Sequence, residues 1–201
     1  MYHDEQTPVV VPLIAEELAS LMYLAGAAGV TSIVGTVGYG SIDDDGFDVG
    51  MRGLLVRGVV AIGADGAVIT TIGRDVVRLL CTPEYAAYLF VVEGGTFDTV
   101  LLTSIDGLTA AVSVQAEGAF VVGVRPSAMA ESVMRILIEQ TPENADAEWP
   151  VGMRLQALTA EPLDIALGAG RRGLVLNGAP QQASDVEIIA AIKASLVPLP
   201  A

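Results

Sequence analysis

Residues 86–125 read AAYLFVVEGGTFDTVLLTSIDGLTAAVSVQAEGAFVVGVR, four apolar runs separated by short glycine-containing pairs. These pairs are Gly94-Gly95, Asp106-Gly107 and Glu117-Gly118, residues that accept the positive φ of tight hairpin corners. The stretch therefore predicts a four-stranded antiparallel meander. Because a two-residue turn fixes the register, we expect Glu93 to face Thr96, with the equivalent pairing at the other two turns.

Side-chain alternation divides the meander into two faces. We expect the more uniformly apolar face to be the core; its members are Tyr88, Phe90, Val92, Phe97, Leu101, Ile105, Leu108, Val112, Val114 and Val121. The opposite face mixes apolar and polar residues and is too apolar to be left entirely to solvent. We expect a protein partner there, and the predicted partner-binding residues are Leu89, Val100, Leu102, Ser113, Gln115, Phe120 and Val122. The alternative is that a helix over residues 127–138 and the C-terminal segment bury the apolar members within the chain.

The chain upstream of the meander predicts three helices and a short hairpin. Apolar residues recur at helical spacing, Pro12 suits the first turn of the opening helix, and Ala64-Asp65-Gly66 turns a two-stranded wing. Helix, helix, wing, helix is a winged-helix-like order, which often binds DNA. We expect no nucleic-acid partner, because four arginines over residues 48–84 are balanced by four acids within a strongly negative chain.

The chain downstream of the meander predicts a helix from Ser127, a polar linker, two short strands and a final helix capped by Ser184. The predicted fold class is α+β: a winged-helix-like helical segment leading into a four-stranded antiparallel meander packed by helices, with a small C-terminal α/β appendage. We expect a domain over residues 1–140, a linker over 141–150 and an extension over 151–201 that packs on the first domain.

Composition excludes several classes of protein. Of 201 residues, 52% are hydrophobic and 17% are charged, so the chain is able to bury a substantial core. Mean hydropathy is +0.58, yet every long apolar run is broken well before 18 residues, so we expect no membrane span. The N-terminus carries Asp4 and Glu5 instead of a basic region, which predicts no secretory signal and a cytoplasmic location.

Residues that usually carry catalysis are scarce, and we expect neither an enzyme nor a bound cofactor or metal. The only histidine is His3, and neither a Walker-type loop nor a dinucleotide fingerprint is present. The only cysteine, Cys81, lies in an apolar helical run that indicates an inert core thiol. The acidic run over residues 43–45 indicates a solvated loop and helix entry; a calcium loop is the alternative, but the spaced ligands are missing. Arg171-Arg172 reads as a loop pair that offsets nearby acids, or alternatively as an anion site.

The order of elements over residues 13–138 resembles the N-terminal half of the EspG family, the cytosolic chaperones of actinobacterial type VII secretion. The similar stretches are residues 15–21, 24–26, 54–60, 76–83 and 120–125. They are hydrophobic patterns and contain no catalytic signature. The resemblance implies a mixed α/β fold and a role in keeping helical PE/PPE-type substrates soluble by binding an exposed apolar tip. Family members carry a second α/β half in quasi-twofold relation to the first, whereas this chain is short beyond residue 140.

The sequence thus predicts a cytosolic, non-enzymatic protein-binding domain, a secretion chaperone or adaptor. The alternative is an acidic immunity-type protein that blocks a basic toxin, because 24 acids against 10 bases give a formal net charge of −14. We also expect a C2 homodimer, because residues 120–124 read as an apolar outer strand that invites pairing.

Overall fold

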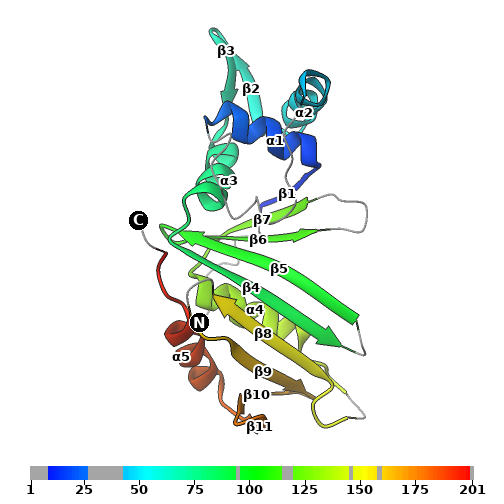
Figure 1. The fold of residues 1–201 in the computed structure, drawn as a ribbon, viewed down its shortest axis with the longest axis vertical. Coiled ribbons are helices and arrows are strands. Elements are labelled where there is room, and N and C mark those ends of the chain that lie inside the picture. The colour runs from blue at the N-terminus through cyan, green and yellow to red at the C-terminus, as the bar shows by residue number, and fades with distance from the viewer. Residues whose placement is uncertain are drawn as a thin grey trace. The chain divides into compact units, whose positions relative to one another are not determined.

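The computed structural model describes residues 9–26, 43–93, 96–114, 120–144, 147–157 and 160–199. The elements in chain order (Figure 1) are β1 (Val9–Leu13), α1 (Ala15–Leu24), α2 (Asp44–Val56), β2 (Val60–Gly63), β3 (Gly66–Ile69), α3 (Thr71–Cys81), β4 (Tyr85–Glu93), β5 (Thr96–Ile105), β6 (Leu108–Val114), β7 (Phe120–Pro126), α4 (Met129–Gln140), β8 (Val151–Ala157), β9 (Leu163–Gly168), β10 (Arg171–Leu176), β11 (Ala179–Gln182) and α5 (Asp185–Ser195). None of the helices in these ranges has the length and apolar character that a bilayer crossing requires.

The α+β class is confirmed, but the architecture differs from the expected one. Nine of the strands found in these ranges form one antiparallel sheet in the order β1-β7-β6-β5-β4-β8-β9-β10-β11, and β2 pairs with β3 separately. The expected meander is therefore only part of a larger sheet, and the description as a winged-helix-like segment with a meander fits poorly. The C-terminal segment is not an appendage, because β8 pairs along β4 from Ala87↔Ala157 to Glu93↔Val151.

The chain divides into two compact units. The first unit holds residues 1–83 and 110–126, and the second holds residues 84–109 and 127–201. The expected boundary at residues 141–150 does not coincide with this division, since β8 to β11 belong to the same unit as β4 and β5.

In the first unit, β1 pairs along β7 from Val9↔Val124 to Leu13↔Phe120. Two expectations change as a result. β7 is not an outer strand, so the edge expected to form a homodimer is already paired within the chain. Pro12 lies in β1, the end strand of the sheet formed by the described residues, where a missing N–H is tolerated, and α1 begins later, at Ala15.

Glycines allow α1 and α2 to approach closely. A Cβ at Gly50 would stand 2.2 Å from the backbone oxygen of Glu16, so a larger residue would push the helices apart. Gly53 leaves room for the carboxylate of Glu17, which is buried and accepts hydrogen bonds from the Ile14 N–H at 2.9 Å and the Arg57 Nε at 2.9 Å. These bonds tie the start of α1 to the end of α2.

Two other predictions for the first unit can be compared with the structure. Asp43 is the N-cap of α2, where its side chain accepts from the Gly46 N–H at 2.8 Å, in agreement with the expected helix entry. The Cys81 thiol lies 3.2 Å from the sulfur of Met22, and burial raises its pKa, which disfavours the reactive thiolate.

In the second unit, α4 and α5 pack against each other on one face of the sheet; α4 lies behind β4 and β8 in Figure 1, and α5 contacts β9 and β10. The buried residues between the two layers include Leu89, Leu102, Leu155 and Ile165 from the strands and Val133, Leu137, Ile188 and Ile192 from the helices. The register explains which face is buried. Leu89 pairs with Leu155, so β8 adds its alternating apolar residues to the side of β4 that carries Leu89.

The expectation that the side of β4 with Tyr88, Phe90 and Val92 is the core is therefore wrong. Tyr88 and Phe90 are half-buried and Val92 is 45% exposed. Other members of the expected core face, Leu101 and Val112, are buried.

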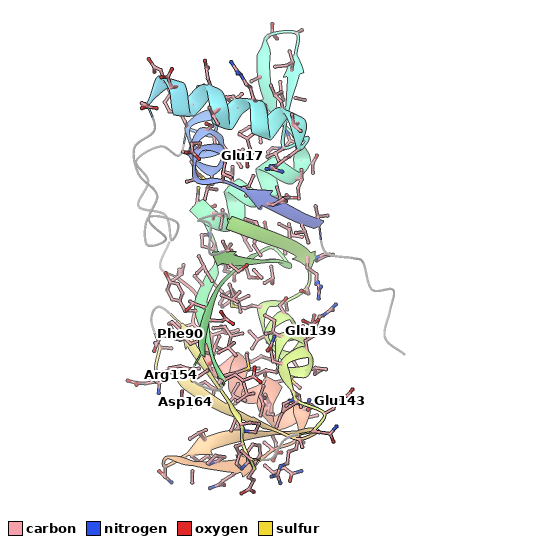
Figure 2. The ribbon with its side chains drawn as sticks, turned by 90° about the vertical axis from the view of Figure 1, so that its right-hand side faces the viewer. Glu17, Phe90, Glu139, Glu143, Arg154 and Asp164 are labelled. Atoms are coloured by element: carbon pink, nitrogen blue, oxygen red, sulfur yellow. The ribbon has the colours of Figure 1, made fainter. Side chains whose placement is uncertain are left out.

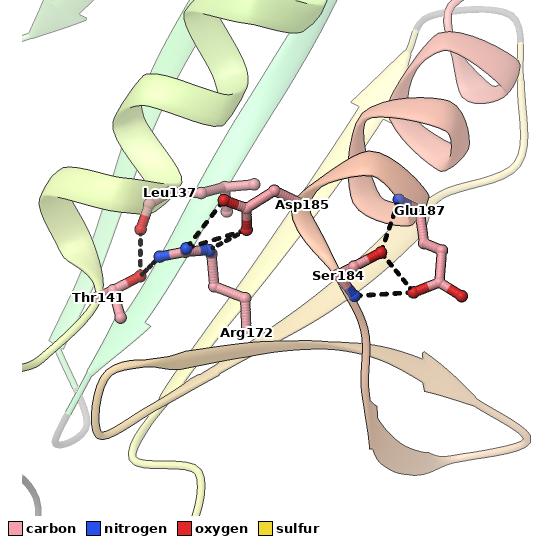
Figure 3. Close-up of polar contacts among 6 residues, drawn as sticks. All are labelled: Leu137, Thr141, Arg172, Ser184, Asp185 and Glu187. Atoms are coloured by element: carbon pink, nitrogen blue, oxygen red, sulfur yellow. Dashed lines mark hydrogen bonds and ion pairs between the residues drawn. The ribbon is translucent and has the colours of Figure 1, made fainter.

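Arg172 fastens both helices to the sheet (Figure 3). From β10 its guanidinium donates to Thr141 Oγ1 at 3.1 Å, just after α4, and to both carboxylate oxygens of Asp185 at 3.0 and 3.2 Å, in the first turn of α5. Ser184 caps α5 as predicted, with a reciprocal pair of bonds to Glu187. Arg172 is therefore a structural residue of a strand, not part of a loop.

Candidate protein-binding surface

The face of β4, β5, β8 and β9 opposite α4 and α5, here called the open face, is the candidate site. Figure 2 shows Phe90, Arg154 and Asp164 on one side of this sheet and Glu139 on the other, the side of α4. Strand pairing places Phe90 directly opposite Thr99 and Arg154, and Arg154 opposite Asp164. Among the described residues of the second unit, no helix packs on this face.

Two aromatic rings form an apolar ridge along β4. Tyr88 and Phe90 are two residues apart and so share a face, and their rings stack with centroids 5.9 Å apart at 25°. Val92 continues the same row toward the end of the strand and is 45% exposed. Aromatic side chains bury large areas when they are covered, so this ridge has apolar surface still to lose from water.

A two-pronged ion pair flanks the ridge. Arg154 Nε donates to Asp164 Oδ1 at 2.6 Å, and Arg154 Nη2 donates to Asp164 Oδ2 at 2.8 Å. The hydrogen bonds from Arg154 hold the pKa of Asp164 below its usual value. The pairing fixes the guanidinium plane beside the position of Phe90 and leaves the face without a net charge at this point.

Trp149 extends the open face toward β10. The strand register places Val92, Gly152, Ala166 and Gly173 in one row across the sheet. A Cβ at Gly173 would stand 2.9 Å from the Trp149 ring, which shows that the indole lies over this row. Arg171 stacks on the ring at 4.7 Å from its centroid and pairs with the Glu148 carboxylate at 3.2 Å.

The residue types on the open face are those of a protein interface. Tyr, Phe, Trp and Arg are enriched where proteins bind one another, while catalysis needs grouped acids, bases or nucleophiles. Here the two arginines, Arg154 and Arg171, are each neutralised by a carboxylate. Across the described residues, no group of three or more His, Cys, Asp or Glu side chains is placed to hold a metal ion.

The structure does not bring the sequence-predicted partner residues together on an accessible surface. Leu89, Leu102 and Val122 are fully buried, Val100 is half-buried on the helix side of β5, and Ser113 is half-buried on β6. Phe120 begins β7 opposite Leu13, and Gln115 lies outside the described residues. Leu89 and Leu102 face the layer of α4 and α5, in line with the intramolecular alternative, whereas Val122 is buried in the first unit.

Sequence reasoning missed Arg154, Asp164 and Trp149 because the pairing of β4 with β8 is distant in sequence. One signal was available: residues 151–157 read VGMRLQA, in which Gly, Arg and Gln alternate with apolar residues. This pattern indicates a strand with one exposed face.

No protein-family model matches the sequence, and no curated protein matches it. Among solved structures, the fold is similar to that of the Mycobacterium tuberculosis type VII secretion system chaperone EspG5, determined in complex with a PE25-PPE41 dimer. The TM-score is 0.59 at 9% sequence identity, and the similarity covers 93% of this chain and 95% of that chain. The expected restriction to the N-terminal half is not confirmed, since the similarity in fold spans nearly the whole of both chains.

Proposed function

We propose that this chain binds a helical partner protein on the open face and keeps it soluble, as a non-enzymatic secretion chaperone or adaptor in the cytoplasm. The observation that carries the proposal is the row of Tyr88, Phe90 and Val92 on a sheet face that no helix of the same unit covers in the described residues. The similarity in fold to EspG5 supports it, because that protein is a chaperone whose structure contains a bound protein dimer.

The shape of the surface favours a helix as the bound element. The open face is presented by side chains of four neighbouring strands, so a partner binds across the sheet and not along a strand edge. An amphipathic helix laid on the ridge buries its own apolar stripe against Phe90 and Tyr88, and the Arg154–Asp164 pair forms part of a polar rim. A partner with such a stripe exposes apolar surface when alone and tends to aggregate, and a chaperone that covers the stripe keeps it soluble.

The partner is expected to be another protein. A homodimer through β7 has no support, because β1 already occupies that edge.

The second candidate function, an acidic inhibitor of a basic toxin, rests on the net charge of −14. The open face argues for the chaperone instead, because its two arginines are matched by two carboxylates. Salt distinguishes the two functions. Binding that changes little between low and high ionic strength supports apolar capture, whereas a steep loss with salt supports the inhibitor.

The test compares partners of the wild-type chain and of a Phe90→Asp variant, both recovered from the native host. Proteins that are recovered with the wild-type chain but not with the variant are then produced in a second host, alone and together with each of the two chains. We expect a helical protein that is insoluble alone, soluble with the wild-type chain and insoluble again with Phe90→Asp. Glu139→Lys, on the exposed surface of α4, is the matched control and keeps the partner soluble. A partner that is soluble without the chain, or equally soluble with Phe90→Asp, contradicts the proposal.

A further inference from the structure

The β2–β3 hairpin of the first unit is apolar on both of its faces. Ala61 pairs with Val68 on one face, and Ile62 pairs with Ala67 on the other. All four are exposed, Ile62 at 70% and Val68 at 49%. In Figure 1 the hairpin extends away from α1 and α3. The hairpin therefore groups exposed apolar residues on one element, whereas most protein surfaces carry exposed apolar residues singly.

The foot of the hairpin is firmly fixed, so the element is presented in one orientation. Val60 is buried, and Thr70 Oγ1 donates to the carbonyls of Gly58 and Val59, each at 2.9 Å. A Cβ at Gly73 would stand 2.5 Å from the Val59 oxygen, which shows how closely α3 packs on the same point. A rigid apolar surface loses little conformational entropy when a partner covers it.

Charge decides against a second copy of this chain as the partner. The turn carries Asp65, and the exposed first half of α2 carries Asp44, Asp45 and Asp48. None of the ion pairs within the described part of the chain involves these four carboxylates. Arg74, at the foot, donates to the Ile69 carbonyl and to Thr71. A twofold contact would oppose like charges in a chain of net charge −14, whereas a basic partner is attracted.

The length of the strands decides against an added partner strand. β2 and β3 have four residues each, and alternate residues of an antiparallel pair turn their N–H and C=O groups inward. Each free edge thus offers few backbone groups, while the side chains offer apolar area on both faces.

We infer that the face of the hairpin that carries Ile62 and Ala67, here called the hairpin surface, docks an amphipathic helix whose apolar stripe is flanked by lysine or arginine. Of the two faces it holds the more exposed large side chain, Ile62 at 70% against Val68 at 49%. This surface belongs to the first unit, so it is a second binding site in addition to the open face of the second unit, and it does not depend on the proposed function.

The test is a methyl NMR titration of the full chain, labelled at Ile and Val, with a synthetic leucine–lysine peptide whose leucines recur at helical spacing. We expect the largest shift at the δ1 methyl group of Ile62 and smaller shifts at Val68, on the other face of the hairpin. The variant Ile62→Asn with Val68→Asn should weaken binding at the hairpin at least tenfold, and Val186→Asn, at an exposed valine of α5, should leave it unchanged. A leucine–glutamate peptide with the same stripe should bind at least tenfold more weakly.

Three results overturn the inference: shifts spread evenly over the chain, a double variant that binds as well as wild type, or equal binding of both peptides. A particle of twice the 20.7 kDa chain mass with the hairpin methyl groups at its interface also overturns it, in favour of a second copy. Thermal unfolding checks that the variants are folded, and the single variant Ile62→Asn replaces the double one if that one is destabilised.

Discussion

Truncation of Leu89 tests which side of β4 faces the core. Leu89 is fully buried, pairs with Leu155 of β8 and faces the layer formed by α4 and α5. Leu89→Ala removes three carbon atoms from a packed interior and leaves a cavity, so we expect it to lower the free energy of unfolding by about 3 kcal/mol. For a chain of this length that corresponds to a fall in Tm of roughly 6–12 °C. Val92→Ala, on the open face at 45% exposure, should lower the free energy of unfolding by only about 0.5 kcal/mol.

The assay is urea unfolding of the two variants and the wild-type chain, followed by circular dichroism and by tryptophan fluorescence. The midpoint should shift for Leu89→Ala with an unchanged m-value, because the surface exposed on unfolding stays the same. Coincident curves from the two probes check that unfolding is two-state. An equal loss in the free energy of unfolding for the two variants, or a larger loss for Val92→Ala, would refute the assignment of the buried and open faces of β4.

Three further outcomes are expected. Gly50→Ala should lower the free energy of unfolding by about 1–3 kcal/mol in urea titrations, because its Cβ meets the backbone of α1, whereas Gly152→Ala, whose Cβ meets nothing within 4 Å, should have little effect; equal effects contradict the close helix contact. The hydrogen bonds from Arg154 depress the pKa of Asp164, so its contribution to stability is present above about pH 4 and is lost as the pH falls through the folded-state pKa. Asp164→Asn should therefore flatten the acid-side decline of Tm slightly, since the carboxylate is 35% exposed, and a steeper decline would contradict the pairing. Arg172→Ala should lower stability by about 2 kcal/mol and Arg172→Lys by less, and a neutral alanine variant would show that its bonds to the two helices do not matter.

Local features were predictable because their causes are local. The pair Gly94-Gly95 correctly predicted that Glu93 pairs with Thr96. The pair Asp106-Gly107, between two apolar runs, correctly predicted a turn, and both residues have positive φ. The cap of α5 at Ser184 followed from its own sequence for the same reason. These features depend on backbone geometry within a few residues.

The side of the sheet that is buried was not predictable in this way, because both faces of β4 are apolar. Leu89 and Val91 are aliphatic, Tyr88 and Phe90 are large aromatic side chains, and alternation alone assigns neither set to the core. Pairing with β8, about sixty residues away in sequence, decides the outcome. Leu89 and Leu102, which were expected at a partner site, are buried against the helices for that reason. Arg154 is recognised as a surface residue only when its strand is placed beside Phe90.

Site-specific photo-crosslinking in the native host tests most directly whether the open face binds a protein partner. A benzoylphenylalanine at position 90 replaces one aromatic ring of the open face, and the same group at position 139 lies on the opposite side, on α4. We expect irradiation to join the position-90 chain to a single helical protein and to leave the position-139 chain unjoined. A partner captured from position 139 and not from position 90 would contradict the account.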